Sequence, residues 1–383
     1  MQYRAFGNTG YEVSALGMGC MRMPTTDGVP CGKNVDEKEA VRMIRAAVDG
    51  GVNYLDTAYP YHGGRSEEVV GLALKDGYRD KTRIASKSPV FLLEQAEDFD
   101  RILDIQLKRL GADCIDFYLL HALSLNTWTN KALKFDLLTK MDKARGQGKI
   151  RHLGFSYHDK GFEEFRTIVD GWDQWDFCQI QLNYTDVYHQ AGVEGLEYAA
   201  SKGLGVVIME PLLGGKLANP PEQVRRVIDR LEPPKSPVEW ALDYLWDRPE
   251  VGIILSGMSS GEQIVSNLAY ADRARTGMLG AEERALFEQA RVTFETMALV
   301  PCTKCSYCMP CPFGVDIPGV FDAYNRTVSH GGKAAAERYD ALGGNAALCR
   351  RCRRCEKACP QHIAVSERMP IIDDWFRHLD TDE

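Results

Sequence analysis

The sequence has no apolar run close to the roughly 20 residues that a transmembrane helix needs. Its first residues, "MQYRAFGNTGYEVSALG", contain neither a long apolar core nor a small-residue cleavage site, so we expect no signal peptide. These two absences favour a soluble protein of the reducing cytoplasm with no membrane partner.

A surplus of positive charge is absent too. The net charge of the 383 residues is −8, and it arises before Pro301, where 35 basic residues face 43 acidic ones. After that point, 11 basic residues balance 11 acidic ones. Because proteins that bind nucleic acid usually carry a clearly basic domain, we expect no nucleic acid partner.

The sequence also lacks a G-x-G-x-x-G after an early strand, which argues against a Rossmann dinucleotide-binding domain. It has instead a series of eight apolar runs rich in β-forming residues. They span Val13 to Gly19, Val52 to Asp56, Thr82 to Lys87, Asp116 to His121, Arg151 to Ser156, Phe177 to Asn183, Gly205 to Glu210 and Val251 to Ser256.

Segments with helical period lie between these runs. One such apolar stripe comprises Ala40, Val41, Ile44, Ala47 and Val48, and another begins at Phe99. Strand and helix alternating eight times predict a parallel sheet with crossover helices. The number eight favours closure into a (β/α)8 TIM barrel over an open doubly wound sheet.

Several of the eight runs end in polar residues. In barrels of this kind, chemistry takes place at the carboxyl ends of the strands. Asp56, Lys87 and His121 end three successive runs, so we expect them to meet on one rim and to shift one another's pKa values. Any one of them alone would be interpreted as a capping or salt-bridge residue.

The segments "LDTAYPYHGGRSEEVVGLALK", "IASKSP" and "DFYLLH" resemble the aldo/keto reductase superfamily, whose fold is this barrel. The opening "YRAFGNTGYEVSALGMGCMRM" and the later "FCQIQLNYTD" and "MEPLLGGKL" are similar to it as well. The resemblance covers most of residues 1–298, which we assign to the barrel domain. It implies an oxidoreductase that moves a hydride between NAD(P)H and a carbonyl or alcohol.

The resemblance assigns the family's catalytic tetrad to Asp56, Tyr61, Lys87 and His121. Tyr59 is the rival tyrosine, but the family spacing and the following "HGGRSEE" select Tyr61. Hydride transfer leaves an alkoxide that must receive a proton, and a tyrosine with an ordinary pKa of about 10 is a reluctant acid. Lys87 as a cation would stabilise the tyrosinate, Asp56 would orient Lys87, and His121 would bond the carbonyl oxygen.

The resemblance also implies six cofactor contacts. Ser156 and Gln179 would meet the nicotinamide carboxamide, and the adenosine end would lie among Gly257, Ser259, Gln263 and Asn267.

The sequence departs from the family pattern near the nicotinamide. The usual Ser-Asn pair reads Ser156-Tyr157 here, so one amide contact is missing or is supplied by His158. Met209 stands where many members place an aromatic ring that stacks on the nicotinamide.

A second departure concerns the choice of nucleotide. Members that prefer NADP often have a Lys and an Arg around the loop that reads "SGMSSGEQ" here, but this chain has Gly257 and Gln263 there. Because a phosphate dianion binds best to charged donors, the loop favours NAD(H) over NADP(H). Arg273 and Arg275 remain as alternative partners for a 2′-phosphate.

Eight of the twelve cysteines stand in two short runs after Pro301. The second run, C-x2-C-x2-C-x3-C-P, has the bacterial ferredoxin spacing for a 4Fe-4S cluster, and the first has x2 before its last cysteine. The connection Phe313 to Leu348 looks largely helical. We therefore predict a small, mainly α-helical ferredoxin-type domain over residues 299–383 that carries two 4Fe-4S clusters.

In two-cluster ferredoxins, the fourth cysteine of each run ligates the other cluster. One cluster would then be bound by Cys302, Cys305, Cys308 and Cys359, and the other by Cys349, Cys352, Cys355 and Cys311. Two tetrahedral zinc sites are the alternative for cysteines at such spacing.

Four arginines are interleaved with the second cysteine run: Arg350, Arg351, Arg353 and Arg354. Cations beside an anionic cluster would raise its reduction potential or receive an acidic electron carrier. The plain alternative is a solvated rim.

Three functions stay open. The first is carbonyl reduction or alcohol oxidation with Tyr61 as general acid and base, and the complete tetrad favours it. The second is an electron-transfer protein whose barrel binds a nucleotide or a redox protein partner. The third makes the clusters purely structural. A hydride carries two electrons, whereas each cluster accepts one and no flavin motif is present, so the role of the clusters stays open. The identity of the substrate has no signature in the sequence.

Overall fold

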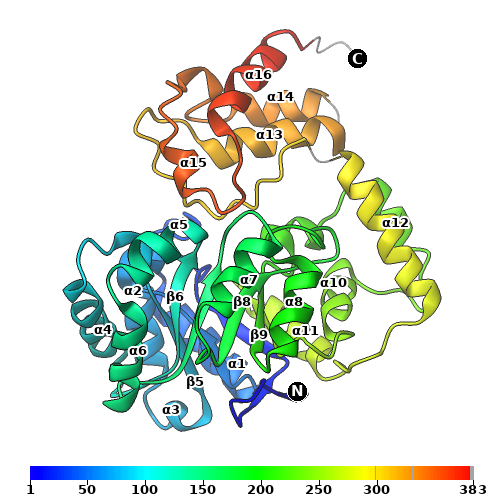
Figure 1. The fold of residues 1–383 in the computed structure, drawn as a ribbon. Coiled ribbons are helices and arrows are strands. Elements are labelled where there is room, and N and C mark those ends of the chain that lie inside the picture. Colours follow the sequence, from blue (N-terminus) through cyan, green and yellow to red (C-terminus); the bar gives the residue numbers. More distant parts are fainter. Residues whose placement is uncertain (298, 330–331, 380–383) are drawn as a thin grey trace. The chain divides into compact units, whose positions relative to one another are not determined.

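Eight parallel strands close into a barrel, as the sequence predicts (Figure 1). In barrel order they are β10 (Ile253–Ser256), β3 (Leu16–Gly19), β4 (Tyr54–Asp56), β5 (Arg83–Ser88), β6 (Ile115–Leu123), β7 (Ile150–Tyr157), β8 (Phe177–Gln181) and β9 (Gly205–Met209). The computed structural model describes residues 1–297, 299–329 and 332–379. The (β/α)8 fold class is confirmed, and each predicted run contributes one strand of the barrel.

Helices alternate with the strands. They are α1 (Glu37–Asp49), α2 (Arg65–Ala73), α3 (Tyr78–Lys81), α4 (Glu97–Leu110), α5 (Leu125–Thr127), α6 (Leu137–Gly146), α7 (Phe162–Asp170), α8 (Gly192–Ser201), α10 (Pro237–Trp246) and α11 (Gly261–Ala271), with the short turns η1 (Tyr61–Gly64), η2 (Val90–Leu92) and η3 (Trp128–Leu133). In α1, the Asp36 side chain caps the first turn by accepting a hydrogen bond from the Glu39 backbone N–H. Of the predicted stripe of α1, Ala40, Ile44, Ala47 and Val48 are buried, whereas Val41 is half-buried.

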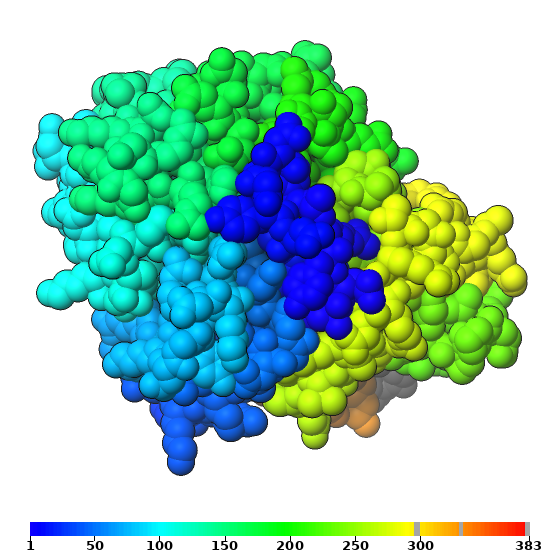
Figure 2. Space-filling model, turned by 90° about the horizontal axis from the view of Figure 1, so that it is seen from below, coloured from blue at the N-terminus to red at the C-terminus, as the bar shows by residue number. Residues whose placement is uncertain are grey.

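An N-terminal hairpin, which the sequence pattern did not reveal, precedes the barrel. It consists of β1 (Tyr3–Ala5) paired antiparallel with β2 (Glu12–Ser14). Phe6, next to β1, is fully buried and packs against the rings of Phe117 and Phe177, at centroid distances of 5.4 and 5.9 Å. Figure 2 shows the N-terminal residues lying across this face of the barrel. The hairpin therefore closes the end of the barrel at which the strands begin.

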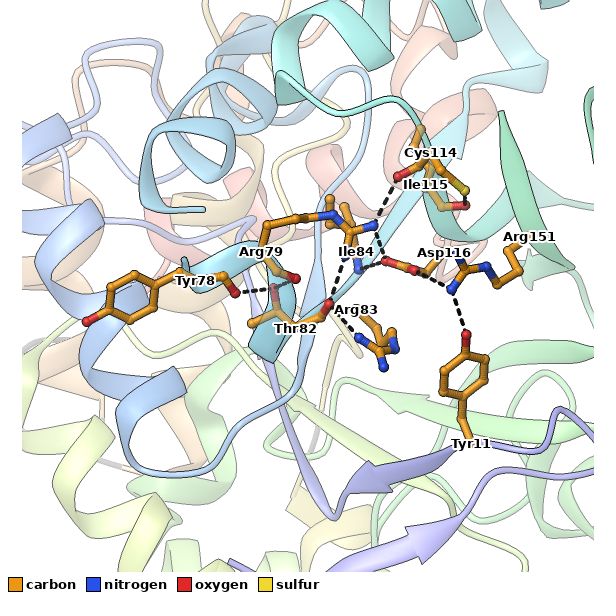
Figure 3. A network of polar contacts seen from close by, with 10 residues as sticks. All are labelled: Tyr11, Tyr78, Arg79, Thr82, Arg83, Ile84, Cys114, Ile115, Asp116 and Arg151. Carbon is orange, nitrogen blue, oxygen red and sulfur yellow. Dashed lines mark hydrogen bonds and ion pairs between the residues drawn. The ribbon is translucent and has the colours of Figure 1, made fainter. Parts of the chain in front are cut away.

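Asp116 ties three strands together at the same end (Figure 3). Its buried carboxylate accepts a hydrogen bond from the Ile84 backbone N–H of β5 at 2.8 Å. It also forms ion pairs with Arg79 at 2.8 Å and with Arg151 of β7 at 3.3 Å. Because chemistry in such barrels lies at the opposite end of the strands, this network stabilises the fold.

The cysteine-rich part of the chain is helical. Its helices are α12 (Ala281–Met297), α13 (Ile317–Ser329), α14 (Gly332–Asp340), α15 (Arg354–Ala358) and α16 (Val365–Arg377), with the turn η5 (Ala346–Leu348). A small core that includes Val320, Phe321, Met369 and Ile372 lies between α13 and α16. The connection between the two cysteine runs is thus mainly helical, as the sequence predicts.

By compactness, the chain forms two units that do not divide at residue 298. The first comprises Met1–Pro211 and Leu242–Leu279, and the second comprises Leu212–Ala241 and Gly280–Glu383. The second unit therefore also contains η4 (Leu213–Ala218) and α9 (Glu222–Ile228), which come from the segment between β9 and β10. The division into domains 1–298 and 299–383 stays a prediction. Among the described residues, no helix is long and apolar enough to span a membrane.

Candidate functional site

Four side chains of the predicted tetrad meet at the carboxyl ends of neighbouring barrel strands. Asp56 is the last residue of β4, Lys87 lies one residue before the end of β5, and His121 lies two residues before the end of β6. Tyr61 begins η1, the turn that follows β4. All four side chains are buried. The parallel strands therefore bring together residues that are up to 65 positions apart in the sequence, from Asp56 to His121.

The Lys87 ammonium group connects the members of this site. It donates hydrogen bonds to Asp56 Oδ1 at 2.5 Å and to the Thr57 carbonyl at 2.9 Å. It also donates to the Tyr61 hydroxyl oxygen at 3.3 Å. The Tyr61 and His121 rings meet edge to face, with centroids 5.8 Å apart. The tyrosine hydroxyl thus lies beside a cation and near an imidazole.

Burial and charge set the ionisation of the site. Burial raises the pKa of Asp56 and lowers the pKa of Lys87, and in each case the charge of the other residue opposes the shift. Burial, together with the charges of Lys87 and His158, holds the pKa of His121 well below its usual value. His121 is therefore a neutral imidazole at pH 7, which can donate one hydrogen bond and accept another.

The rival tyrosine is directed elsewhere. The Tyr59 ring lies 4.5 Å from the Arg109 guanidinium carbon, and the Tyr59 carbonyl accepts a hydrogen bond from Arg109 at 3.2 Å. Tyr61, in contrast, contacts Lys87. The geometry therefore favours Tyr61 as the proton donor, as the family spacing does.

A buried polar network behind Lys87 escaped the sequence analysis. Glu67 in α2 is fully buried, and its Oε1 accepts hydrogen bonds from Ser86 and from Gln106, each at 2.6 Å. Gln106 also donates to the Lys87 carbonyl at 3.1 Å, and Arg109 donates to Glu67 Oε2 at 3.1 Å. The helical period held a signal, because Glu67 lies three residues before the buried Val70, on the inward face of α2.

The predicted nicotinamide contacts lie on adjacent strands. Ser156 of β7 is the register partner of Gln179 of β8. The Ser156 hydroxyl accepts a hydrogen bond from the Ala122 backbone N–H at 2.8 Å. Gln179 is buried, and its Oε1 atom has no hydrogen-bond partner among the described residues. An amide N–H of a bound carboxamide would satisfy such a buried acceptor, so this part of the site fits the cofactor.

The predicted adenosine contacts surround the start of α11. The Ser260 hydroxyl caps the helix by accepting from the Gln263 N–H at 3.3 Å, while Gln263 Oε1 accepts from the Ser259 N–H at 2.7 Å. Asn267 is buried and donates to the Ser256 hydroxyl at 2.9 Å. Gly257 is exposed in the same loop. These residues form a braced loop at a helix N-terminus, a place suited to anionic groups.

A cation that the sequence analysis missed lies at this end of α11. A Cβ atom added at Gly261 would lie 3.3 Å from the Arg42 guanidinium, which therefore reaches the first turn of α11. Glu39 binds Arg42 at both ends of its carboxylate, at 2.6 and 2.7 Å. Arg273 and Arg275 instead follow the last residue of α11, about 16 Å away along the helix. The expectation that these two arginines reach the loop is therefore not supported.

Trp128 does not present its ring to solvent. The side chain is 3% exposed, and its ring packs against Trp175 at a centroid distance of 6.1 Å. Another aromatic residue, Phe91, lies beside the tetrad and could contact a substrate there. The Phe91 ring lies 5.7 Å from the His121 ring and is 41% exposed.

A small hollow lies among cysteines of both runs. Its lining includes Cys302, Cys305, Cys308 and Cys359, together with apolar side chains such as Phe321. These are the four ligands predicted for one cluster. In the described part of the chain, no three Cys, His, Asp or Glu side chains converge as closely as a single metal ion requires. Four thiols spread around a hollow fit a cluster.

The two cysteine runs share a left-handed backbone conformation at two matching positions around their first two cysteines. The second residue after the first cysteine has a left-handed φ in both runs, 58° at Lys304 and 52° at Arg351. The residue after the second cysteine does too, 63° at Ser306 and 60° at Arg353. The Lys304 N–H donates to Cys302 Sγ and the Arg351 N–H donates to Cys349 Sγ, each at 3.4 Å. These turns direct an N–H group at the first cysteine sulfur of each run, and hydrogen bonds of this kind influence the reduction potential of a bound cluster.

For the second predicted ligand set, the structure gives the burial of each cysteine and the packing of three of them. Cys311, Cys349 and Cys355 pack against the same small core, and Cys352 is exposed. The pairing of Cys311 with the second run therefore stays a prediction.

Comparisons with known proteins find relatives of both the barrel and the cysteine-rich part of the chain. The model of the aldo/keto reductase family matches residues 15–276, and the model of the 4Fe-4S dicluster domain matches residues 301–364. The chain is 27% identical over 314 residues to L-galactose dehydrogenase of Arabidopsis thaliana, covering 75% of this chain and 93% of the plant protein. It is 32% identical over 179 residues to aldo-keto reductase YhdN of Bacillus subtilis, covering 44% of this chain and 51% of that protein.

Solved structures show the same fold. The thermostable aldo-keto reductase Tm1743, solved with the inhibitor epalrestat, is 26% identical and has a TM-score of 0.61. The match covers 76% of this chain and 100% of the Tm1743 chain. Aldo-keto reductase AKR11C1 from Bacillus halodurans, in its holo form, is 24% identical with a TM-score of 0.61, covering 76% of this chain and 96% of that one.

Proposed function

The chain belongs to the aldo/keto reductase family and carries a 4Fe-4S dicluster domain, and from this premise we propose that it is an NAD(P)-dependent carbonyl reductase or alcohol dehydrogenase. The observation that carries the proposal is the contact of the Lys87 ammonium group with both Asp56 and the Tyr61 hydroxyl. No stability argument requires this arrangement, because burying a lysine costs free energy that Asp56 only partly restores.

The residues divide the work of proton transfer. Tyr61 gives its proton to the oxygen of the carbonyl carbon that receives the hydride. The Lys87 cation at 3.3 Å stabilises the tyrosinate that remains, and Asp56 holds that cation in place. In the oxidative direction the same tyrosinate removes the proton of the alcohol.

His121 polarises the carbonyl. Because its pKa is well below the usual value, the ring is uncharged at pH 7 and offers an N–H to the substrate oxygen. A neutral donor leaves the positive charge of the site on Lys87, where it acts on Tyr61 and not directly on the substrate.

Bound NAD(P)H would supply the hydride from its nicotinamide. Ser156 and Gln179 would hold the carboxamide, and the adenosine end would lie at Gly257, Ser259, Gln263 and Asn267. We favour NAD(H), because Arg42, which lies beside the first turn of α11, is already bound by Glu39, and Arg22, which lies beside Gly257, pairs with Glu210 at 3.6 Å.

The proposal extends to the clusters and the setting. Two 4Fe-4S clusters would be bound by the two ligand sets described above, and the hollow lined by Cys302, Cys305, Cys308 and Cys359 supports the first set. A domain that uses free thiolates for iron belongs in a reducing compartment, so we propose the cytoplasm.

The test is oxidation of NADH and of NADPH by anaerobically purified protein with a panel of aldehydes, ketones and ketosugars. The Tyr61→Phe variant should lose at least about a hundredfold in kcat/KM, because it removes the general acid. Tyr59→Phe is the matched control and should keep its activity. Turnover that survives in Tyr61→Phe, or absent turnover by iron-replete protein with every carbonyl, would overturn the proposal.

A further inference from the structure

The two cysteine runs form similar turns around their first two cysteines but differ in the number of cationic residues there. At the four positions next to the first two cysteines, the first run has Thr303, Lys304, Ser306 and Tyr307. At the same four positions the second run has Arg350, Arg351, Arg353 and Arg354. Because both runs form the same turns, with left-handed φ values at matching residues, the fold itself does not require the arginines.

All four arginines are exposed to solvent. Lys357 in α15 and the ligand candidate Cys352, between the arginine pairs, are exposed as well. In the first run Thr303 is buried, and the other three residues are half-buried. Cationic side chains therefore surround the most accessible cysteine of the second run.

The pairing of charges separates the runs further. Lys304 forms an ion pair with Asp322 at 2.7 Å, and the same carboxylate also pairs with Arg326 and Arg338. In the second run Arg353 pairs with Glu356 at 2.8 Å. Within the residues that the structure describes, no carboxylate lies within ion-pair distance of Arg350, Arg351 or Arg354.

We propose that this cationic loop, defined as Arg350–Arg354 with Lys357, is the docking surface for an acidic one-electron carrier protein. The unpaired cations attract such a carrier over a distance of about a Debye length and orient it, and Cys352 places the cluster edge at the contact. The inference rests on the proposed second cluster, bound by Cys311 with Cys349, Cys352 and Cys355.

The electron transfer is a one-electron exchange that balances as written. The reduced carrier loses one electron, the oxidised 4Fe-4S cluster gains it, and no bond forms and no proton has to move. The exchange requires no hydride from the barrel, so it does not depend on splitting an electron pair.

Charge complementarity favours an acidic protein. The chain as a whole has a net charge of −8, so the loop is a local cationic patch on an anionic molecule. The part of the chain after Pro301 balances 11 basic residues against 11 acidic ones, so the patch matches a compact acidic surface and not a nucleic acid, which would call for a clearly basic domain.

The test uses the full-length protein, reconstituted anaerobically, with a small acidic plant-type [2Fe-2S] ferredoxin as the probe. Stopped-flow mixing measures the second-order rate constant for electron transfer as a function of salt. The variant is Arg350→Glu with Arg354→Glu and Lys357→Glu, since these positions have ordinary backbone angles and tolerate substitution. A matched control with the same change of charge is Arg225→Glu with Arg226→Glu and Lys333→Glu, all exposed residues.

At low salt the rate of the triple variant should fall at least about tenfold and lose its salt dependence, while the control stays within about twofold of the unaltered protein. Iron content and carbonyl turnover, measured on the same samples, should be unchanged in both. Equal rates in the triple variant and the unaltered protein would overturn the docking surface. So would a rate that falls only in proportion to a shifted cluster potential, which would assign the arginines to tuning. Protein that cannot bind the second cluster also overturns it.

The two proposals fail separately. Loss of carbonyl turnover in every sample, with salt-dependent electron transfer retained, would remove the reductase function and leave the docking surface in place.

Discussion

Lys87 shows how a single residue is kept charged inside the barrel. Its ammonium group is buried but has three oxygen partners, from Asp56, Thr57 and Tyr61. Removing an ammonium ion from water costs several kcal/mol even when a partner is present. The role proposed for Lys87 beside the Tyr61 hydroxyl would give a functional reason for a residue that carries such a cost.

The ionisation of His121 leads to a prediction about pH. Because burial holds its pKa well below 6.5, the imidazole stays neutral as the pH falls through that value. The kcat/KM of carbonyl reduction should therefore show no decline centred near pH 6.5 over a range of about pH 5.5 to 7.5. The pH profile of the unaltered protein, with His121→Gln as the comparison, checks this. A decline centred near pH 6.5 that is absent from His121→Gln would show that His121 titrates normally.

Glu67 leads to a prediction about stability. Ser86, Gln106 and Arg109 all donate to its two carboxylate oxygens, whereas a glutamine offers one oxygen and would turn an N–H₂ group toward a donor. Glu67→Gln should lower the free energy of unfolding by about 2 to 4 kcal/mol, measured by urea denaturation followed through tryptophan fluorescence.

The neighbouring Glu68→Gln is the control for this change. Glu68 pairs with Arg65 at the surface and should cost less than about 1 kcal/mol. Equal effects of the two substitutions would mean that the buried network does not stabilise the barrel.

At the scale of the elements, the two cysteine runs repeat one turn. Each run places left-handed residues at the same positions and directs an N–H group at its first cysteine sulfur. Each run is then followed by a 13-residue helix, α13 or α16, and both helices pack on the same small core. The same turn thus occurs in both cysteine runs, while the residues between the cysteines differ in charge.

The contact of α1 with the start of α11 leads to a prediction about the nucleotide. Glu39 neutralises Arg42 beside the first turn of α11. Glu39→Gln should free the guanidinium for a 2′-phosphate and raise kcat/KM for NADPH relative to NADH about fivefold. Steady-state kinetics with both nucleotides measure the ratio. The control is Glu37→Gln, a change on the same helix as Glu39 that removes an ion pair with Arg65 of α2. An unchanged ratio in Glu39→Gln would exclude Arg42 from phosphate recognition.

At the scale of the whole molecule, the chain combines an aldo/keto reductase barrel with a 4Fe-4S dicluster domain. If both ligand sets are filled, anaerobically purified protein should contain about eight iron and eight sulfide ions per chain. Cys359→Ser should lose about half of the iron and one of two cluster signals in the EPR spectrum of reduced protein. Cys178→Ser, a buried cysteine of β8, is the control and should keep all of the iron. Zinc in place of iron would contradict the cluster assignment.

Much of the barrel could be predicted because its signals are local. Each barrel strand is visible in the sequence as an apolar run. Gly111 ends α4 with a left-handed backbone conformation, as its position after the last apolar residue of the helix indicates. The hairpin of β1 and β2 escaped because three-residue strands are too short to show alternation. The Glu67 network escaped because a buried carboxylate is recognised only by the donors that surround it, and these come from β5 and α4.

The sequence by itself determined the strand order of the barrel, the identity of the tetrad candidates and the spacing of the cysteines. It could do so because hydrophobic period, turn residues and ligand spacing act over a few residues. Only the tertiary structure decided that Lys87 contacts Tyr61 and not Tyr59, and that Arg42 and not Arg273 lies at the start of α11. These are contacts between segments far apart in the chain, and they depend on how strands and helices pack in space.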